Sequence, residues 1–493
     1  MDKIDRIEDV AKRRGFFWIS SEIYGGLSGF YDYAHLGTAM KRKWENLWRS
    51  SFLNEDNFHE IETCDVMPEN VFKASGHLKS FVDPLVKCKK CGFTERADTI
   101  LEEQLHEKFE GLSAEELTKV IKKHGIKCPK CRGYLADVGL LNMMFPVSIG
   151  TEKSAIAYLR PETAQGAYVN FNQEFECLRK KIPLGLAIIG KAYRNEISPR
   201  NVLLRMREFS QAELQIFFDP DKINEHENFD EVKNYKLIVF KTGSKKTEEI
   251  ACSELAKSLP KFYVYYMAKI QKFYLDTIKL PKAVFRFKEL SEEERAFYNK
   301  YHWDIELDLS LGWKEVAGIH YRTDHDMSGH QKVSKKDLSV FADGKKFVPH
   351  VLELSFGVDR NILALLDFAY DEDNRKLFRF PRNLAPYDAA VFPLVNKDKL
   401  PELAKETKQM LQSLGFTVFY DDSGSIGRRY RRMDEIGVPA SVTIDNQTTE
   451  DNTVTLRDRD SMKQVRIKKD ELCMALRKFI DGEKIEKLGE IIS

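Results

Sequence analysis

The stretch Leu204–Phe217, which reads LRMREFSQAELQIF, does most to decide how this chain folds. Side chains of a β-strand point alternately to its two faces, and here one set of alternating positions is mostly apolar. The other set is polar apart from one aromatic residue: Arg205, Arg207, Phe209, Gln211, Glu213 and Gln215. We therefore predict an antiparallel strand with one face in the core, whose second face is either solvated or part of a binding site.

A second strand is predicted just upstream, over Leu184–Lys191, where the sequence is almost entirely apolar. It leads into Arg194 and Glu196, and a loop containing Pro199 returns the chain, so that the two strands form a long hairpin. Arginine donates two parallel hydrogen bonds from a planar group that stays charged at any working pH. Three arginines and an aromatic residue on one hairpin can therefore hold a nucleotide.

The segment Val351–Leu366, VLELSFGVDRNILALL, predicts a strand, a tight turn at Gly357 and a helix. Glu353 and Ser355 share one face of that strand. Arg360 falls in the first helical turn, where the positive end of the helix dipole adds to its charge. Taken alone, such a unit is structural in most proteins.

Together these segments resemble motifs 2 and 3 of the class II aminoacyl-tRNA synthetases, through Arg194-x-Glu196 on the hairpin and Gly357-x-x-Arg360 at the turn. The opening Gly29–Tyr33 (GFYDY), followed by Gly37 and a helix predicted over Thr38–Phe52, is similar to their motif 1 region.

Three blocks make the resemblance more specific. Arg160–Gly166 (RPETAQG), Arg194–Glu213 and Trp313–Gly318 (WKEVAG) resemble glycyl-tRNA synthetases of the homodimeric, archaeal and eukaryotic type. This resemblance implies an ATP-dependent ligase that attaches glycine to its cognate tRNA through a glycyl-adenylate and forms AMP and pyrophosphate. The alternatives are another synthetase of the same subgroup, prolyl or threonyl, or a non-catalytic synthetase-like protein that binds RNA or DNA.

The implied fold is α+β. A class II antiparallel sheet flanked by helices is expected over residues 1–384, with one insertion at 88–133 and a helix-rich insertion at about 219–295. From residue 385 to 493, strands alternate with helices, which predicts a separate α/β domain. Its segments Gly424–Tyr430 and Met433–Gly437 resemble the anticodon-binding domain of the glycyl, prolyl, threonyl and histidyl enzymes.

For ATP, the resemblance implies that Arg194 holds the α-phosphate and Arg360 the γ-phosphate, and these two are the expected catalytic residues. Glu196 would approach the adenine amino group, Phe209 would stack on the ring, and Glu315 would help to hold the Mg²⁺ that accompanies ATP. The full ATP set is Arg194, Asn195, Glu196, Leu204, Arg205, Met206, Arg207, Glu208, Phe209, Glu315, Val316, Gly357, Val358, Asp359 and Arg360.

For glycine, the resemblance places carboxylates around the α-ammonium group, and Arg96 near the substrate carboxylate. Glycine has no side chain to grip, so its binding energy must come from these charged groups. The full glycine set is Arg96, Glu162, Phe209, Ser210, Gln211, Ala212, Glu213, Glu353, Leu354, Ser355, Phe356 and Gly357.

Four of the eight cysteines form two pairs, Cys88-x-x-Cys91 and Cys128-x-x-Cys131. Two such knuckles can supply the four thiolates of a structural zinc site, although the 36 residues between the pairs exceed the usual ribbon spacing, and unligated cysteines are the alternative. We expect a polar helical stretch over Leu101–Lys123, opened by Ser113–Glu116, to fill the gap.

Composition restricts the remaining possibilities. The 493 residues carry 78 Lys and Arg against 77 Asp and Glu, a net charge of +1, so overall charge gives no sign of a nucleic-acid partner. No apolar run approaches the roughly 18 residues of a membrane span. We expect no membrane partner and a cytoplasmic location, and the resemblance implies a homodimer that binds ATP, glycine and tRNA. The cluster Arg428, Arg429, Arg431 and Arg432 is either a solvated helix face or an RNA-contacting surface.

Overall fold

The computed structural model describes residues 3–54, 57–107, 109, 111–151, 156–295, 299–371, 375 and 377–492. Its centre is a nine-stranded sheet in the order β13-β12-β14-β15-β16-β19-β11-β10-β3. Neighbouring strands are antiparallel except for the pairs β12–β14 and β10–β3. The bounds in that order are Glu248–Ala251, Lys236–Phe240, Phe285–Glu289, Tyr301–Leu309, Gly312–Thr323, His350–Gly357, Glu208–Phe218, Leu184–Tyr193 and Phe58–Glu60.

The predicted hairpin is present, with one change of boundary. Strand β10 extends Leu184–Lys191 by two residues, and it pairs with β11 from Leu184 opposite Phe217 to Tyr193 opposite Glu208. Strand β11 begins at Glu208 rather than at Leu204, because Val202–Leu204 forms a turn of 3-10 helix before it. The alternation expected over the whole stretch therefore applies only from residue 208 onward.

The central strands have one apolar and one polar face. On β11, Ala212, Leu214 and Ile216 belong to the main core, which also includes residues of α2 (His35–Phe52), α9 (Lys261–Lys272) and α11 (Val358–Ala369). Trp44, Trp48, Phe52 and Phe356 form an aromatic cluster in that core. Since both faces of β11 are buried, the solvated alternative for its polar face is wrong.

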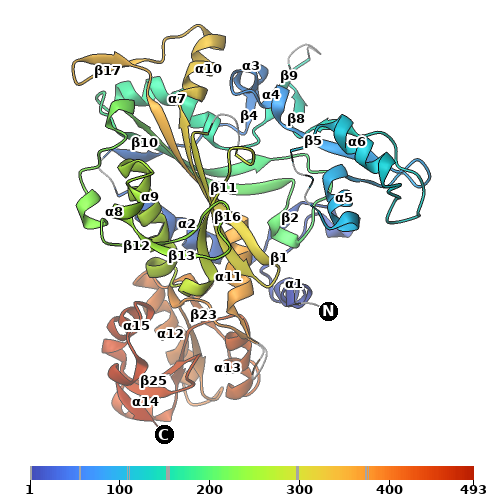
Figure 1. The fold of residues 1–493 in the computed structure, drawn as a ribbon. Helices are drawn as coiled ribbons and strands as arrows, with labels where there is room; N and C mark the ends of the chain where they lie inside the picture. Colours follow the sequence, from blue (N-terminus) through green and yellow to red (C-terminus); the bar gives the residue numbers. More distant parts are fainter. Residues whose placement is uncertain are drawn as a thin grey trace.

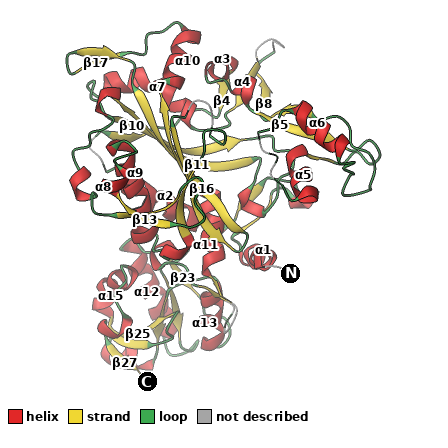
Figure 2. Ribbon diagram, viewed as in Figure 1, coloured by secondary structure: helices red, strands yellow, loops and turns green. Residues whose placement is uncertain are grey.

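Helices α7 (Ala164–Cys177) and α10 (His325–Ser334) cover one end of the opposite face of the sheet. Tyr168, Phe171 and Phe175 pack there with Phe217 and the apolar residues of β10 in a second core cluster. Figure 2 shows these helices and the layer of α2, α9 and α11 around the central strands. The part of the polar face that α7 and α10 leave uncovered is where the candidate site lies.

Residues 219–295, expected to be rich in helices, contain α8 (Cys252–Leu255), α9 and a π-helical turn at Phe273–Thr277. The same stretch also supplies β12, β13 and β14, three strands of the main sheet. Strand pairing with β15 therefore makes this stretch continuous with the central sheet.

The cysteine pairs lie in a segment that projects to one side of the sheet (Figure 1). A three-stranded sheet, β5 (Val82–Lys87), β6 (Thr94–Arg96) and β7 (Gly139–Asn142), carries two helices, α5 (Ala97–Leu105) and α6 (Ala114–Lys123). The single helical stretch expected over Leu101–Lys123 is thus two helices, and positions 108 and 110 lie outside the described residues. The capping box at Ser113 and Glu116 is confirmed.

Residues 389–492 form a second sheet beside the first (Figure 1). Its order is β23-β22-β24-β25-β26-β27, with bounds Val418–Tyr420, Ala389–Pro393, Ala440–Ile444, Thr453–Asp458, Gln464–Lys468 and Glu490–Ile492. The helices are α12 (Leu400–Ser413), α13 (Ile426–Glu435), α14 (Asn446–Asp451) and α15 (Leu472–Ile480). The predicted alternation of strands and helices is confirmed, while β26, β27 and α14 were not foreseen.

The shorter elements complete the chain. Helix α1 (Lys3–Arg14) contacts α11, and Arg14 pairs with Glu435 of the C-terminal part. The others are β1 (Phe17–Ile19), β2 (Tyr31–Tyr33), β4 (Val66–Pro68), α3 (Glu69–Ala74), α4 (His77–Ser80), β8 (Phe145–Ser148), β9 (Ile156–Leu159), β17 (Val340–Ala342), β18 (Lys345–Phe347), β20 (Tyr370–Asp371) and β21 (Leu377–Phe378). Among the residues that the structure describes, no helix is both long and apolar enough to cross a membrane.

Candidate active site and metal centre

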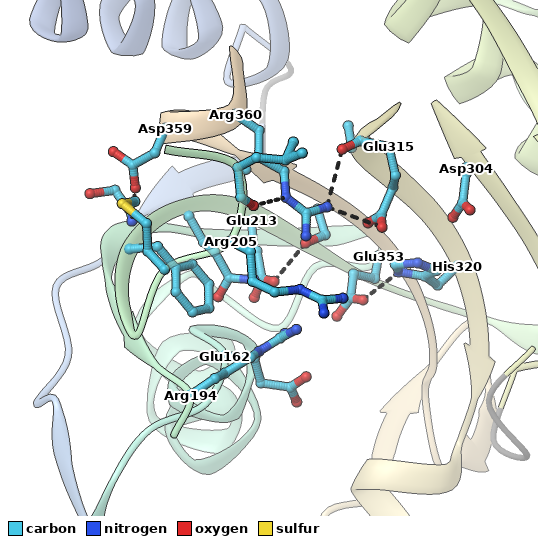
Figure 3. Close-up of a pocket in the computed structure, with 18 of the residues that line it drawn as sticks. Glu162, Arg194, Arg205, Glu213, Asp304, Glu315, His320, Glu353, Asp359 and Arg360 are labelled. Carbon is cyan, nitrogen blue, oxygen red and sulfur yellow. Dashed lines mark hydrogen bonds and ion pairs between the residues drawn. The ribbon is translucent and has the colours of Figure 1, made fainter. Parts of the chain in front are cut away.

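A cavity of about 310 Å³ opens on the polar face of β11, β19 and β16. Strand alternation explains its lining, because the apolar core occupies the opposite face of the same strands. Most of the expected site residues meet there (Figure 3). Those that line the cavity are Glu162, Arg194, Glu196, Leu204, Arg205, Met206, Phe209, Ser210, Gln211, Glu213, Glu315, Glu353, Ser355, Gly357, Asp359 and Arg360.

The expected residues that do not line the cavity fall into two groups. One group belongs to the core on the other face of the strands or in the first turn of α11: Ala212, Val316, Leu354, Phe356 and Val358. The other group forms polar contacts outside the cavity: Arg96, Asn195, Arg207 and Glu208.

Arg207 illustrates why strand alternation fails before residue 208. Its guanidinium donates to the carbonyl oxygens of Glu196, at 2.9 and 3.0 Å, and of Ser28, at 3.0 Å. Its backbone N–H donates to the carbonyl of Gly29, where a Cβ would lie 2.8 Å from Pro199. Arg207 therefore ties the N-terminal GFYDY segment to the hairpin.

Arg96, expected near the substrate carboxylate, forms ion pairs within its own segment. Its guanidinium lies 3.0 Å from Asp83 and 2.6 Å from Asp98. The hydrogen bond to Asp98 and the charges of both partners raise the pKa of Arg96 above its ordinary value despite partial burial. A contact with a substrate would require Arg96 to leave at least one of these carboxylates.

One end of the cavity is a buried cluster of carboxylates. Glu213 accepts hydrogen bonds from the hydroxyl groups of Thr163 and Ser355, both at 2.7 Å. Burial raises the pKa of Glu213 to about 7, and the charges of Glu353 and Glu162 add to this rise. A cationic group placed among these carboxylates would reverse part of that rise.

Arg322 is the cation of this cluster, and the sequence interpretation missed it. Its guanidinium lies 2.8 Å from Asp326, 2.9 Å from Glu353 and 3.5 Å from Glu162. Burial lowers its pKa, but the charges of Asp326 and Glu353 outweigh burial and keep the pKa of Arg322 well above its ordinary value. The sequence signal that could have identified Arg322 is the alternation of polar residues along β16, which His302 and Asp304 continue on β15.

The other end of the cavity carries three of the four arginines that line it, Arg194, Arg205 and Arg360. The Arg194 guanidinium lies 5.2 Å from the centre of the Phe209 ring. Arg360 pairs with the Glu315 carboxylate at 3.0 Å and donates to the carbonyl of Leu204. Gly357 leaves room for this arrangement, since a Cβ there would lie 3.3 Å from the Arg360 side chain. Two opposite charges thus lie side by side at the cavity mouth.

Among the described residues that line the cavity, two polar atoms are buried without a hydrogen-bond partner, Oε2 of Glu196 and Oδ1 of Asn299. The Oε2 atom of Glu196 is buried and has no hydrogen-bond partner, although Arg205 lies 3.8 Å away. A buried acceptor without a partner costs free energy, which a donor bound at this position would recover. Arg205 itself has its pKa lowered by burial and by neighbouring arginines, against the opposing charge of Glu196.

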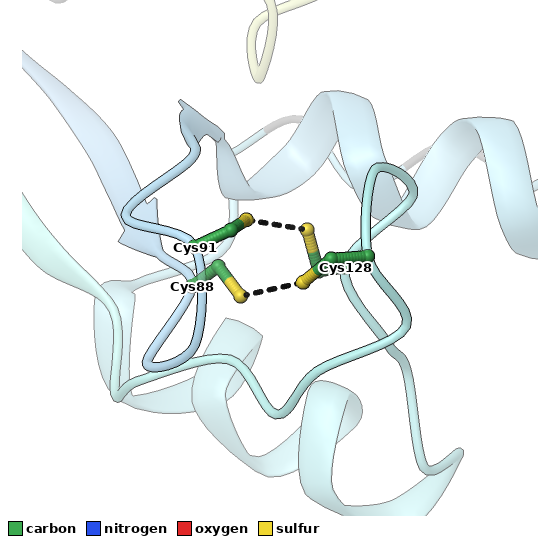
Figure 4. Close-up of side chains that lie close together, drawn as sticks. Cys88, Cys91 and Cys128 are labelled. Carbon is green, nitrogen blue, oxygen red and sulfur yellow. Dashed lines mark hydrogen bonds between the residues drawn. The ribbon is translucent and has the colours of Figure 1, made fainter.

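The four paired cysteines converge (Figure 4). Their sulfur atoms all lie within 4.8 Å of one another, with 3.5 Å between Cys88 and Cys131 and 3.7 Å between Cys91 and Cys128. Four thiolates about 2.3 Å from a tetrahedral zinc ion would be about 3.8 Å apart. Backbone N–H groups that point at its sulfur lower the pKa of Cys88 to about 6, whereas hydrogen bonds with the other thiols raise the pKa of Cys131. The donor set therefore fits zinc.

The basic cluster on α13 is only partly available to a ligand. Arg429 is buried and donates to the carbonyl oxygens of Pro393 and Gly424, and Arg432 pairs with Asp421. The expectation that all four arginines form one surface is therefore wrong for Arg429, whereas Arg432 is partly exposed beside Asp421. Arg428 and Arg431 remain exposed on the helix.

Comparisons with known proteins identify the family of both parts of the chain. A family model described as the tRNA synthetase class II core domain (G, H, P, S and T) matches residues 148–369, and an anticodon binding domain model matches residues 388–479. A crystal structure described as the RNA binding domain of threonyl-tRNA synthetase from Cryptosporidium parvum superposes with a TM-score of 0.61 at 18% identity. It covers 97% of this chain and 98% of that one. The fold is that of a class II aminoacyl-tRNA synthetase.

The particular family follows from curated relatives named glycine–tRNA ligase. The relative from Pyrococcus horikoshii is 43% identical over 98% of this chain and 99% of its own length. Those from Thermococcus sibiricus and Aeropyrum pernix are 43% and 40% identical, over 98% and 99% of this chain and 99% of their own lengths. The chain belongs to the glycine–tRNA ligase family, which confirms the resemblance found in the sequence and disfavours the prolyl, threonyl and non-catalytic alternatives.

We predict that Glu213→Gln stabilises the folded chain at alkaline pH. The folded-state pKa of about 7 lies above the ordinary value of 4.5, so stability is lost as pH rises from 4.5 through 7. The glutamine cannot ionise and escapes this loss, by up to about 3 kcal/mol at pH 8. Urea denaturation at pH 8.0 and pH 4.5 measures the effect, which should be small at the lower pH. Equal gains at both pH values would exclude a raised pKa.

Proposed function

We propose that this chain catalyses the ATP-dependent attachment of glycine to tRNA through a glycyl-adenylate, with AMP and pyrophosphate as the other products. The observation that carries the proposal is a single cavity with buried carboxylates at one end and arginines at the other. An amino acid would bind by its ammonium group at the first end and ATP by its phosphates at the second. Membership of the glycine–tRNA ligase family supports glycine as the amino acid.

At the ATP end, the residues act by position and charge, because transfer of the adenylyl group needs no protein nucleophile. Arg194 would hold the α-phosphate that the glycine carboxylate attacks, and Phe209 would stack on the adenine. Glu196 would accept a hydrogen bond from the adenine amino group, which matches its unpartnered Oε2 atom.

The Arg360–Glu315 pair would open when ATP binds. Arg360 would turn to the γ-phosphate, and Glu315 would offer its oxygens to the Mg²⁺ that accompanies ATP. A hard cation of this kind neutralises phosphate charge. Each side chain would thus exchange one partner of opposite charge for another.

At the glycine end, Glu162, Glu213 and Glu353 would surround the α-ammonium group, and Ser355 would fix Glu213. Three carboxylates and one guanidinium leave an excess of negative charge that a substrate cation would balance. Since no common amino acid is smaller than glycine, discrimination rests on excluding larger side chains by overlap. No editing activity is needed for that task.

We further propose that the four cysteines bind one structural zinc ion, because four thiolates leave no open coordination position for catalysis. The α/β part over residues 385–493 would bind the anticodon end of tRNA. The enzyme would act as a cytoplasmic homodimer. Exposed Ile23, Tyr24 and Leu27, between β1 and β2, support a protein contact near the motif 1 segment.

The ATP assignment predicts the behaviour of Arg194→Ala and Arg360→Ala. Each variant loses a charge-assisted contact to a phosphate, and glycine-dependent exchange of labelled pyrophosphate into ATP should fall by about 100-fold or more. The matched control is Lys191→Ala on the same hairpin, whose partner Glu208 lies outside the cavity. Near-normal exchange in either arginine variant, with an unchanged circular dichroism spectrum, would refute the assignment.

The glycine assignment predicts that Glu162→Ala and Glu213→Ala raise the KM for glycine at least about tenfold, since a hydrogen bond to a charged group contributes about 1.5–3 kcal/mol. The KM for ATP should hardly change. Glu208→Ala, on the same strand as Glu213 but outside the cavity, is the control. The wild type should activate L-alanine only marginally; an unchanged glycine KM in both variants, or efficient alanine activation, contradicts the pocket model.

The metal assignment predicts about one zinc ion per chain by elemental analysis of protein purified under reducing conditions without chelator. Cys88→Ser should lower the zinc content and expose residues 88–133 to proteolysis, because zinc binding stabilises the fold of its segment. Exposed Cys177 provides the control substitution, Cys177→Ser. Protein free of zinc under these conditions would rule out the site.

A further inference from the structure

A row of four polar side chains crosses the sheet beside the glycine end of the cavity. In register, Gln215 of β11 lies opposite Glu353 of β19, Glu353 opposite His320 of β16, and His320 opposite His302 of β15. The sequence interpretation placed Gln215 on the polar face of its strand, and it assigned a role in the site only to Glu353. The two histidines also line the cavity and have had no role assigned so far.

The hydrogen bonds along the row are continuous. The Nδ1 atom of His320 lies 2.5 Å from Oε1 of Glu353, and its Nε2 atom lies 2.9 Å from Nε2 of His302. Nε2 of His302 also lies 3.1 Å from Asp304. Figure 3 shows the His320–Glu353 contact within the cavity. A change of charge on either histidine therefore changes the electrostatic environment of the Glu353 carboxylate.

The contact between the two Nε2 atoms limits the charge of the pair. Two nitrogens 2.9 Å apart share one hydrogen, so only one of the two rings can donate there. If both His302 and His320 were imidazolium ions, two N–H groups would face each other. The pair therefore holds at most one positive charge.

That charge belongs on His320. Burial lowers its pKa, but the hydrogen bond to Glu353 and the charge of Glu353 outweigh burial and raise the pKa above 6.5, against the charge of Arg322. Burial and the neighbouring His320 lower the pKa of His302, although Asp304 and Glu315 oppose this. These are the charged groups that β15, β16 and β19 present to the two rings.

Glu353 has little room for a second cation. Its Oε2 atom already accepts hydrogen bonds from Gln215, at 2.8 Å, and from Arg322, at 2.9 Å. A substrate ammonium group would have to approach Oε1, the oxygen that His320 occupies. Two cations would then share one buried carboxylate oxygen, where like charges repel strongly.

We propose that His320 is a positioning residue that supplies the cationic partner of Glu353 before glycine binds and gives up one proton when the glycine ammonium group arrives. This inference rests on the proposed function. The Nε2 proton of His320 passes to Nε2 of His302, and His302 releases its Nδ1 proton to water. Both rings are then neutral, with Nδ1–H of His320 still donating to Glu353 and Nε2–H of His302 pointing toward Asp304 and His320.

The surroundings of His302 suit this exchange. The Asn299 side-chain nitrogen lies 3.5 Å from Nδ1 of His302 and can donate to that atom once its proton has left. The total charge of the glycine pocket is then the same before and after binding, because the ammonium group replaces the lost imidazolium charge. It also makes glycine affinity depend on pH, because below the pKa of His320 the substrate must displace a proton.

The number of protons released per glycine can be measured by calorimetry. Glycine is titrated into the full chain at pH 6.5, in buffers of different ionisation enthalpy. We expect release by the wild type and clearly less by His320→Gln, whose amide still donates to Glu353 but does not titrate. Between pH 8.0 and 6.0 the KM for glycine should rise more steeply in the wild type than in this variant, by a factor on the order of threefold. The KM for ATP should stay unchanged.

The variant His302→Gln removes the second histidine of the proposed proton transfer and should also reduce proton release. The test therefore stays decisive if one of the two variants folds poorly. The matched control is His350→Gln on β19, because His350 pairs with Tyr321 and does not line the cavity. Release by Glu213, expected from its pKa of about 7, persists in the histidine variants. If His320→Gln and His302→Gln both release as many protons per glycine as the wild type, the proposed proton transfer from His320 through His302 is wrong. If the wild type shows no glycine-dependent exchange of pyrophosphate into ATP, the proposed function is wrong instead.

Discussion

The carboxylate-rich end of the cavity depends on the ion pairs of one buried group, the guanidinium of Arg322. Three carboxylates, from Asp326, Glu353 and Glu162, lie within 2.8–3.5 Å of it, and each comes from a different element of the fold. Removing one partner of a buried ion pair typically costs about 3–5 kcal/mol, because the remaining charge is left uncompensated. Arg322 therefore fixes the positions of helix α10, strand β19 and the loop before α7 relative to one another.

A stable cluster of this kind need not be electrically neutral. Arg322 compensates part of the negative charge, and the remainder appears as the raised pKa of Glu213. The folded protein thus contains an electrostatically destabilised carboxylate, Glu213, at the place where a substrate cation is expected. A substrate cation without a side chain can gain binding energy by stabilising the charge of that carboxylate.

Much of this organisation could be predicted from the sequence, and the reasons for failure are specific. The hairpin and the strand–turn–helix were readable, because alternation and a glycine before a helix are local signals. Arg207 was misplaced, since nothing local indicates that β11 begins at Glu208. Arg322 and His320 were missed, because their importance arises from register with Glu353 across two strands. The strands within 219–295 were hidden among helices, and only pairing with β15 reveals them.

The division of the central strands into an apolar and a polar face has a consequence for how the enzyme can change. On β11 and β19, neighbouring residues along the chain have different surroundings: Leu214 and Leu354 pack in the core, whereas Glu213 and Ser355 line the cavity. Natural variation can therefore tune the pocket at one position without disturbing the core at the next. A single-residue insertion or deletion inside these strands would instead exchange the two sets at once. Length changes should accumulate in the connecting loops, while the strands keep a fixed count.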